Sequence, residues 1–275
     1  MAPTSSSLLI ATYNWPEALT IVLTSVRAQR TMPTEVIIAD DGSGDATRRL
    51  TEAEARAFPV PLRHVWHEDR GFRLGTIRNK AMASATGEYL IQLDGDMVLH
   101  PAFVGSHLAF ALRGSYVQGS RVMLDEARTA ECLAGGRIVT TPLSHGVRNR
   151  VNALHLPWLS SVVRGPTDPL RRTRGCNMAF WRDDVVRVNG YNEEIEGWGR
   201  EDSELAARLQ HSGVRRRNLK FSAVAWHLYH DPRPQGSLAQ NHEAYERTRA
   251  SRLTRRARGI DQWLAASAPG PDARR

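Results

Sequence analysis

Two aspartates separated by one glycine are the residues of this chain best placed to do chemistry. Asp94 and Asp96 follow the apolar run 89–93, which is typical of a buried strand. Residues two apart in an extended chain project to the same side, and Gly95 lets the backbone turn there or a ligand approach closely. Carboxylates held together repel each other unless a cation lies between them. Unless it is only a solvated acidic turn, the pair predicts a Mg²⁺ or Mn²⁺ site, completed by substrate phosphates, at the end of a parallel strand.

A second acidic turn follows the apolar run 36–39. Asp40 and Asp41 precede Gly42 and Ser43 there. A carboxylate at such a strand end can accept hydrogen bonds from a nucleotide base or from ribose hydroxyls. The alternative is an ordinary turn in which Asp41 or Ser43 accepts from backbone N–H groups at the start of a helix. The residues alone favour neither interpretation.

A tryptophan between two glycines precedes a third acidic pair. Gly197, Trp198 and Gly199 predict a mobile aromatic loop, and Glu201 and Asp202 follow at the start of a helix. The helix dipole favours ionised carboxylates at that position. Such a carboxylate can act as general base on a hydroxyl while the indole ring stacks on a sugar face. Helix capping alone would explain the acids but not the loop that precedes them.

Two histidines and one arginine are further candidates. His227 and His230 lie at the end of a predicted strand at 223–227, and a neutral imidazole from one of them can complete the metal site. Arg78, in a predicted helix at 76–85, can pair with a phosphate or a base carbonyl of a nucleotide. The alternatives are structural histidines and a solvated surface arginine. No Cys/His spacing predicts structural zinc.

Strands and helices alternate in the first half of the chain, which predicts a doubly wound, mostly parallel α/β sheet. The apolar runs and helical spacings predict strands at 8–12, 36–39, 62–67 and 89–93 and helices at 18–29, 46–57 and 76–85. Later elements are predicted as helices at 101–112, 125–133, 200–212 and 245–258 and strands at 116–123, 176–181 and 223–227. The glycines, prolines and arginines up to 175 predict a mobile loop, and 265–275 is predicted to be a disordered tail.

Composition limits the possible classes of protein. The 275 residues are 41% hydrophobic, enough for one large α/β domain, and no apolar run approaches the ~20 residues of a membrane helix. The polar start predicts no secretory signal, and with two cysteines, Cys132 and Cys176, a reducing cytoplasm is the simpler expectation. The net charge of +8 favours a nucleic acid, an anionic lipid or an acidic substrate as partner, unless it is only a solvated basic surface.

Several motifs together resemble known glycosyltransferases. The segments 10–14, 39–43, 78–79 and 94–96 resemble the donor half of inverting family 2 glycosyltransferases, which have the GT-A fold. The segment 197–202 is similar to the acceptor-side motif of metal-dependent galactosyltransferases, and with 71–73 and 175–178 the combination resembles the modules of bacterial chondroitin polymerases. The resemblance implies one GT-A domain over 1–264, with a nucleotide-sugar half at 7–123, a small acceptor-side subdomain at 124–231 and a basic helical segment at 232–264.

The resemblance also implies a role for each candidate residue. The nucleotide-sugar contacts that it implies are Ala11 through its backbone, Tyr13, Asp41, Arg78, Asp94 and Gly95. The acceptor or sugar contacts that it implies are Asn177, Trp198 and Gly199. Asp96 and His227, or His230 in place of His227, would bind Mn²⁺ or Mg²⁺ at the diphosphate. Asp202 would be the general base, and Glu201 would position the acceptor.

These roles predict a metal-dependent transfer of a sugar from a uridine nucleotide-sugar to a hydroxyl group of a glycan or glycolipid, with inversion at the anomeric carbon. The reaction would belong to the synthesis of cell-surface glycan, lipopolysaccharide or polysaccharide. The arginines between 247 and 258 predict peripheral contact with anionic membrane at its cytoplasmic face, and no nucleic acid is expected as a partner. One alternative, a sugar-1-phosphate nucleotidyltransferase, would need a glycine-rich basic loop after the first strand, and 12–16 contains neither glycine nor lysine. A non-catalytic nucleic-acid-binding protein would need a basic motif interleaved with aromatic residues, which the sequence does not show.

Overall fold

Seven strands form the central sheet of the computed structural model, which describes residues 2–136, 141–160, 162, 168 and 170–264. In chain order they are β1 Ser6–Thr12, β2 Glu35–Asp40, β3 Leu62–Trp66, β4 Tyr89–Asp94, β6 Ser115–Gly119, β9 Asn177–Trp181 and β10 Arg215–Leu219. Their order in space is β10-β6-β9-β4-β1-β2-β3. β9 runs antiparallel to both of its neighbours, whereas the other pairs are parallel. The predicted doubly wound, mostly parallel sheet is confirmed.

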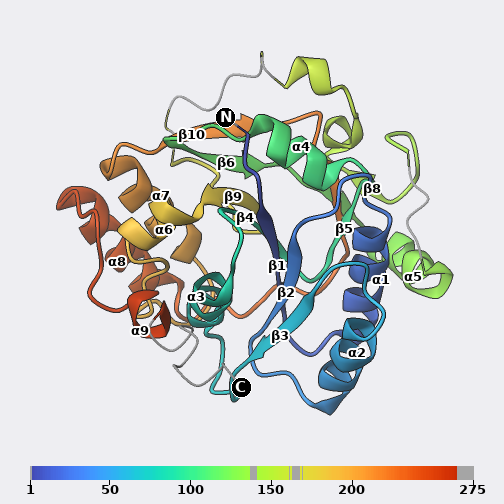
Figure 1. Ribbon diagram of the computed structural model, residues 1–275, viewed down its shortest axis with the longest axis horizontal. Helices are drawn as coiled ribbons and strands as arrows, with labels where there is room; N and C mark the ends of the chain where they lie inside the picture. Colours follow the sequence, from blue (N-terminus) through green and yellow to red (C-terminus); the bar gives the residue numbers. More distant parts are fainter. Residues whose placement is uncertain (1, 137–140, 161, 163–167, 169, 265–275) are drawn as a thin grey trace, which may run out of the picture.

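Helices cover both faces of this sheet (Figure 1). One face carries α1 Pro16–Arg27, α2 Asp45–Ala55, α4 Phe103–Phe110 and α5 Glu126–Gly135. On the other side lie α3 Leu74–Ser84, α6 Arg182–Arg187, α7 Glu201–His211, α8 Leu238–Ala250 and α9 Asp261–Leu264. The helical spacing of Leu19, Val22 and Val26 buries all three in one apolar cluster, and Ile77 and Leu205 belong to a second cluster across the sheet. The sheet is therefore buried on both faces, as parallel sheets are.

A second, four-stranded sheet brings distant segments of the described chain together. β5 Met97–Leu99, β7 Val122–Leu124, β8 Val147–Arg148 and β11 Ala225–His227 pair in the order β5-β11-β7-β8. His227 lies opposite Met97 in the antiparallel pair of β5 and β11. Because Met97 directly follows Asp96, this pairing places a late histidine beside an early aspartate. The division into halves at 123 and 124 remains a prediction, and β10 and β11 pair with strands on the other side of that boundary.

The structure differs from the predicted strands in two places. The segment 116–123 forms β6 and β7, which belong to different sheets. A Cβ atom at Gly119 would lie 2.2 Å from the side chain of Asn177, so this position requires glycine. Apolar residues on both sides of Gly119 made the two strands look like one in the sequence. No strand was predicted for the arginine-rich run 215–217, which lies in β10 at the edge of the central sheet, where basic side chains can remain partly solvated.

Short elements were missed because they contain too few residues to show a period. These are β5, β8, α6, α9 and the 3₁₀ turns η1 Arg150–Ala153 and η2 Pro157–Leu159. η1, η2 and β8 lie in the segment predicted as a mobile loop. Residues 137–140, 161, 163–167 and 169 of that segment lie outside the described residues.

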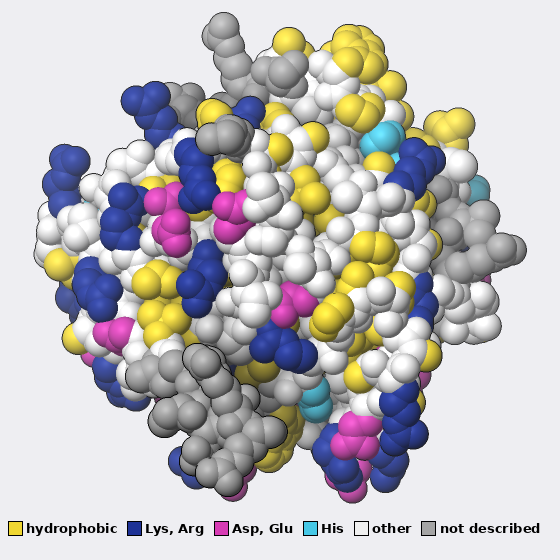
Figure 2. Space-filling model, in the orientation of Figure 1, with side chains coloured by type: hydrophobic (Ala, Val, Ile, Leu, Met, Phe, Trp, Pro, Cys, Tyr) yellow, Lys and Arg dark blue, Asp and Glu magenta, His cyan; other side chains and the backbone are white. Residues whose placement is uncertain are grey.

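The C-terminal basic helix was predicted in the wrong place. α8 ends at Ala250, and Arg252 has a left-handed φ of 49°, so the arginines that follow do not continue its surface. Four of the six arginines between 247 and 258 pair with carboxylates, namely Arg247, Arg249, Arg255 and Arg256. The single basic helix face behind the predicted membrane contact does not form, and Figure 2 shows basic side chains scattered over one face of the molecule, several beside acidic ones. In the described part of the chain, no helix is long and apolar enough to cross a membrane, and the tail 265–275 lies outside that part.

Candidate active site

A cavity of about 750 Å³ opens at the carboxyl ends of β1, β2 and β4. Parallel strands present these ends at one edge of a sheet, so turns that follow different strands meet there. Nearly every residue predicted for the site lines this cavity, namely Ala11, Tyr13, Asp41, Arg78, Asp94, Gly95, Asp96, Trp198, Gly199, Glu201, Asp202 and His227. The exception is Asn177.

The guanidinium of Arg78 links two carboxylates of this cavity. Arg78 Nη2 donates to Asp94 Oδ1 over 2.7 Å, and Arg78 Nη1 donates to Asp202 Oδ1 over 2.9 Å. The Arg78 side chain is only 2% exposed, so both of its amino groups are used inside the protein. Arg78 is thus a cation that holds Asp94 beside Asp202. Its predicted pairing with a phosphate or base of the nucleotide stays a prediction.

Three donors orient the carboxylate of Asp202. Besides Arg78, the hydroxyl of Tyr191 donates to Oδ1 over 3.0 Å, and the N–H of Gly175 donates to Oδ2 over 2.6 Å. Asp202 lies in the first turn of α7, so the helix fixes its backbone while its side chain reaches the cavity. A carboxylate oxygen can accept more than one hydrogen bond, and Oδ2 therefore keeps an acceptor position for a substrate hydroxyl. No motif in the sequence indicated the contact with Tyr191.

The neighbouring carboxyl of Glu201 has a different environment. Glu201 is buried, and its Oε2 atom has no hydrogen-bond partner among the described residues. Burial, followed by repulsion from Asp202, raises the pKa of Glu201 to about 8. This direction favours the protonated form of Glu201 at neutral pH, against the preference of the helix start for an ionised carboxylate.

We expect this protonated carboxyl to make folding stability depend on pH. The pKa of Glu201 is raised from 4.5 to about 8 in the folded state, so between these values the unfolded chain releases a proton that the folded chain keeps. The stabilisation is complete below the lower value, and the free energy of unfolding falls by up to about 1.4 kcal/mol per pH unit as pH rises toward the higher one. Urea unfolding at a series of pH values across this window checks the expectation. The Glu201→Gln variant should lose less stability than the wild type, and parallel curves would contradict it.

The glycine–tryptophan–glycine loop lies against the start of α8. Gly197 donates to the carbonyl of Phe72 over 2.9 Å and has a φ of +74°, and a Cβ atom there would lie 2.2 Å from Ser237 Oγ. Trp198 is 38% exposed and lines the cavity. The loop predicted to be mobile is therefore packed at its first glycine, while the indole ring remains available to a sugar face.

Asp96, His227 and His230 form a cluster of possible metal ligands. One ligand atom from each lies within 4.8 Å of the others, and His230 Nε2 and His227 Nε2 lie 3.3 and 3.7 Å from Asp96 Oδ2. His230 Nδ1 lies 2.7 Å from the carbonyl of Asp231, an arrangement that makes Nδ1 the donor and leaves the Nε2 lone pair for a metal. Burial lowers the pKa of His227, which favours the neutral imidazole that a metal ion requires.

This donor set fits Mn²⁺ or Mg²⁺, with the imidazoles favouring Mn²⁺. Asp96 Oδ1 is buried and has no hydrogen-bond partner in the described part of the chain, so a cation would satisfy it. The sequence left open whether His227 or His230 would be the ligand, and the structure brings both to Asp96. Asp94, held by Arg78, does not belong to the cluster.

Comparisons with known proteins agree with this geometry. A model of glycosyl transferase family 2 matches residues 7–132, and a model described as the N-terminal domain of galactosyltransferase matches residues 161–231. Residues 7–132 belong to glycosyl transferase family 2, and the chain is a glycosyltransferase. This membership favours sugar transfer over the nucleotidyltransferase and nucleic-acid-binding alternatives.

The glycosyltransferase is similar to curated bacterial proteins. It is 28% identical over 239 residues to chondroitin synthase of Escherichia coli, a match that covers 80% of this chain and 34% of that protein. It is 28% identical over 235 residues to validoxylamine A glucosyltransferase of Streptomyces hygroscopicus subsp. limoneus, which covers 76% of this chain and 48% of that protein. The matches thus span less than half the length of these curated relatives.

Solved structures share its fold. TarS 1–349 of S. aureus in complex with UDP has a TM-score of 0.63 at 16% identity, over 96% of this chain and 70% of that one. The mannosyltransferase PcManGT from Pyrobaculum calidifontis, in complex with GDP-Man and Mn²⁺, has a TM-score of 0.59 at 19% identity, over 98% of this chain and 70% of that one. At these identities the likeness shows the fold alone, and the predicted GT-A fold is confirmed.

Two residues expected to hold the base are engaged inside the glycosyltransferase. Asp41 Oδ1 lies 2.7 Å from His67 Nε2, and Asp41 Oδ2 accepts a backbone N–H bond of 3.0 Å. The carbonyl of Ala11 accepts from the N–H of Gly95 over 2.6 Å. The backbone contact expected from Ala11 therefore goes to the protein itself, and the carboxylate of Asp41 is already partnered. Of the expected base contacts, Tyr13 stays 36% exposed at the cavity.

The turn after β2 has a different acceptor from the one predicted. Asp40 Oδ1 accepts from the N–H of Ser43 over 2.8 Å, and Asp40 Oδ2 lies 2.9 Å from His64 Nε2. The side-chain acceptor within this turn is therefore Asp40, and neither Asp41 nor Ser43 caps α2, whose first flanking residue is Gly44. Whether the turn also contacts a nucleotide stays a prediction.

Asn177 does not belong to the site. Its side chain is fully buried, with Oδ1 2.9 Å from His107 Nε2 and Nδ2 donating to the carbonyl of Ser120 over 2.9 Å. Successive side chains of a strand point to opposite sides, and it is the preceding residue, Cys176, that lines the cavity. The predicted contact of Asn177 with the acceptor is wrong, and Asn177 instead fastens β9 to the segment between β6 and β7.

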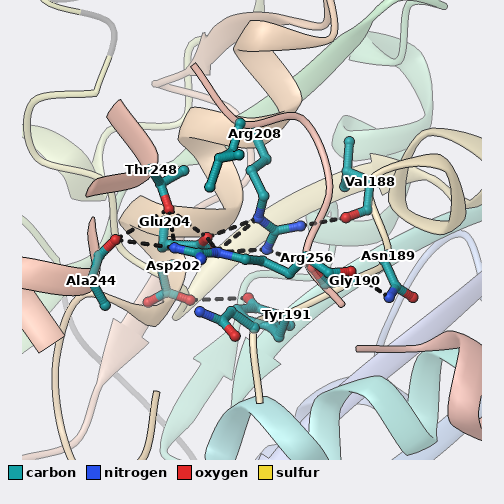
Figure 3. A network of polar contacts seen from close by, with 12 residues as sticks. Val188, Asn189, Gly190, Tyr191, Asp202, Glu204, Arg208, Ala244, Thr248 and Arg256 are labelled. Carbon is teal, nitrogen blue, oxygen red and sulfur yellow. Dashed lines mark hydrogen bonds and ion pairs between the residues drawn. The ribbon is translucent and has the colours of Figure 1, made fainter. Parts of the chain in front are cut away.

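A buried polar network holds α7, and with it Glu201 and Asp202, in place (Figure 3). Glu204 accepts from Arg208 Nη2 over 2.6 Å, from Arg256 Nε over 3.0 Å and from Thr248 Oγ1 over 2.9 Å. Glu204 and Arg208 are fully buried. Arg256 and Thr248 come from the C-terminal segment, so the network ties that segment to the helix that carries the candidate base.

Glu204→Gln should therefore destabilise the fold. The substitution leaves the buried guanidinium of Arg208 without its charged partner, and breaking a buried pair in this way typically costs about 3–5 kcal/mol. Urea unfolding at constant pH measures the change. Glu246→Gln on α8 is the control, because Glu246 pairs with Arg249 at the exposed surface and should change stability by no more than about 0.5 kcal/mol. Equal effects of the two substitutions would show that the buried network does not stabilise the fold.

Proposed function

We propose that this glycosyltransferase transfers a sugar from a uridine nucleotide-sugar to a hydroxyl group of a glycan or glycolipid acceptor, with inversion at the anomeric carbon. One observation carries the proposal, which is that Asp202 and the cluster of Asp96, His227 and His230 open into the same cavity. A proton acceptor and a cation site in one cavity suit a displacement in which a hydroxyl attacks and a diphosphate leaves. The UDP complex of TarS and the name of E. coli chondroitin synthase support a uridine donor and a glycan acceptor.

The donor end of the mechanism rests on the metal-ligand cluster. Asp96, His227 and His230 would hold Mn²⁺ or Mg²⁺, which when bound neutralises the charge of the leaving diphosphate. Asp94 is partly exposed and is fixed in position by Arg78. Its carboxylate can therefore accept hydrogen bonds from hydroxyls of the ribose or the donor sugar.

Asp202 acts as the general base at the acceptor end. Its Oδ2 atom removes the proton of the acceptor hydroxyl as that oxygen forms a bond to the anomeric carbon and the bond from this carbon to the diphosphate oxygen breaks. Because attack comes from the face opposite the leaving group, one displacement inverts the configuration. Glu201 keeps its proton at neutral pH and can donate a hydrogen bond that positions the acceptor, while Trp198 can stack on a sugar ring.

A screen of nucleotide-sugars tests the proposed function. We expect release of nucleoside diphosphate from a uridine nucleotide-sugar only when Mn²⁺ or Mg²⁺ is present, and faster release when a glycan acceptor is added. Calorimetry with UDP, with and without metal, measures donor binding independently of turnover. Turnover that is unchanged by a chelator, or the absence of any nucleotide-sugar binding, would contradict the proposal.

The cellular setting belongs to the same proposal. The names of the chondroitin synthases and of the hyaluronan synthase of Pasteurella multocida support synthesis of a polysaccharide or another cell-surface glycan. Such synthesis would take place in the cytoplasm. Peripheral contact with membrane would have to involve a surface other than the predicted C-terminal helix.

A further inference from the structure

Three arginines line one wall of the cavity, and we refer to Arg121, Arg148 and Arg174 as the arginine wall. Arg121 directly precedes β7, and Arg174 lies three residues before β9. Arg148 belongs to β8 and is opposite Met123 of β7, which is in turn opposite His227 of β11. Arg148 is therefore carried by a strand, while Arg121 lies next to β7 and Arg174 lies three residues before β9, so a strand anchors the backbone close to each.

The arginine wall has no ion-pair partner in the part of the chain that the structure describes. Among the described residues, none of its three arginines has a carboxylate within 4.0 Å. Arg121 Nε is buried and has no hydrogen-bond partner there, and Arg121 Nη1 reaches only Cys176 Sγ, at 3.8 Å. Burial, and then the charge of Arg121, lowers the pKa of Arg174, so these two cations oppose each other. An anion bound between them would relieve that repulsion and supply the missing partner.

The backbone of Arg174 connects the wall to the acceptor side of the site. Gln118 Oε1 accepts from the N–H of Arg174 over 3.0 Å, and Gln118 Nε2 donates to the carbonyl of Arg174 over 2.9 Å. The next residue, Gly175, donates its N–H to Asp202 Oδ2. Arg174 of the arginine wall is thus the sequence neighbour of Gly175, whose N–H helps to orient Asp202, the proposed general base. A ligand group bound there would belong to the molecule whose hydroxyl Asp202 deprotonates.

We propose that the arginine wall binds an acidic group of the acceptor, carried close to the hydroxyl that receives the sugar. This inference rests on the proposed function, because it assumes that Asp202 faces the acceptor. Guanidinium groups bind carboxylate and phosphate alike through paired N–H donors, so the acidic group is either the carboxylate of a sugar acid or a phosphate. The experiment has a separate arm for each.

Three probes with the same sugar ring test the proposal, namely methyl β-glucoside, methyl β-glucuronide and methyl β-glucoside 6-phosphate. Their affinities are measured by NMR titration of the full chain in the presence of UDP and diamagnetic Mg²⁺. We expect at least one anionic probe to bind about tenfold more tightly than the neutral glucoside, and the anion that binds better identifies the acidic group. The double variant Arg148→Ala/Arg174→Ala should lose this preference and keep wild-type affinity for UDP. Arg148→Lys/Arg174→Lys should keep part of the preference, because it retains the charge.

Arg215→Ala is the matched control, because Arg215 is an exposed arginine of β10 that does not line the cavity. It should leave all three probe affinities unchanged. Equal binding of the three probes to a wild-type protein that binds UDP would overturn the arginine wall alone. A double variant that keeps the preference would overturn it too, and one that loses UDP affinity would assign the arginines to the donor diphosphate instead. If the wild type does not bind UDP or any nucleotide-sugar, the proposed function itself fails and the acceptor site fails with it.

Discussion

Asp202→Asn is expected to lower kcat by about 10²–10⁴-fold, the usual contribution of a positioned general base. Asparagine keeps the size of the side chain, and its Oδ1 atom can still accept from Arg78 and Tyr191. It removes the proton acceptor at Oδ2, the oxygen that we assign to the acceptor hydroxyl. Affinity for UDP in the presence of metal should stay nearly unchanged, because the metal-ligand cluster is a separate set of residues. Steady-state kinetics with saturating donor and acceptor, together with calorimetry, measure both quantities.

Glu201→Gln is the control for this substitution. Because the raised pKa of Glu201 favours its protonated form at neutral pH, glutamine nearly reproduces its shape and charge, so kcat should change far less and any loss should appear in the KM for the acceptor. In the Asp202→Asn variant the new side-chain amide would face the N–H of Gly175 as a second donor, so thermal unfolding must confirm that this variant is folded. A folded variant with wild-type turnover would place the base elsewhere, with Glu201 as the next candidate.

The sequence predicted the sheet and the place of the site because both follow from local patterns. The apolar run 89–93 and the spacing of Leu19, Val22 and Val26 are readable without knowledge of any distant contact. Once the sheet is parallel and doubly wound, the turns after β2 and β4 must open at the same edge. That geometry, together with the family resemblance, is why nearly all of the predicted residues line one cavity.

Local sequence patterns could not predict contacts between side chains that are far apart in the chain. Arg78 and Asp202 lie 124 residues apart in the chain, so Arg78 by itself resembles a surface arginine. Its burial between two carboxylates depends on how α3 and α7 are placed around the apolar cluster that they share, which no local period reveals. The same limit explains Glu201, whose raised pKa comes from burial in the folded protein rather than from its position at a helix start.

The alternation of side chains along a strand decides which residues reach the site at two positions. The sequence left open whether His227 or His230 is the metal ligand, but β11 ends at His227, so this alternation does not separate the two imidazoles. Asn177 belongs to a family motif yet points away from the cavity, whereas the residue before it, Cys176, lines the cavity. The motif at 175–178 therefore located the segment correctly, and the geometry of β9 determines which of its side chains reach the cavity.

His230→Ala is expected to lower the affinity for Mn²⁺ by at least about 100-fold. The loss of a residue that merely orients a metal ligand already costs about 10–100-fold, and His230 Nε2 is itself placed as a ligand, 3.3 Å from Asp96 Oδ2. UDP affinity measured with Mn²⁺ should fall in parallel, because the diphosphate would complete the coordination of the metal. Calorimetry with Mn²⁺ alone, and then with UDP at saturating Mn²⁺, measures the two effects separately.

His227→Ala and His242→Ala complete this comparison. His227→Ala should match the loss in His230→Ala, because both imidazoles converge on Asp96, whereas His242 is an exposed histidine of α8 that stacks on Tyr245 and should not matter. If only His227→Ala weakened Mn²⁺ binding, His230 would be a neighbour of the site and not a ligand. If UDP bound the wild type equally well after addition of a chelator, none of the three residues would hold a metal for the donor. Asp96 would then be a partly buried carboxylate whose buried Oδ1 atom has no partner among the described residues, a costly arrangement that the cation otherwise explains.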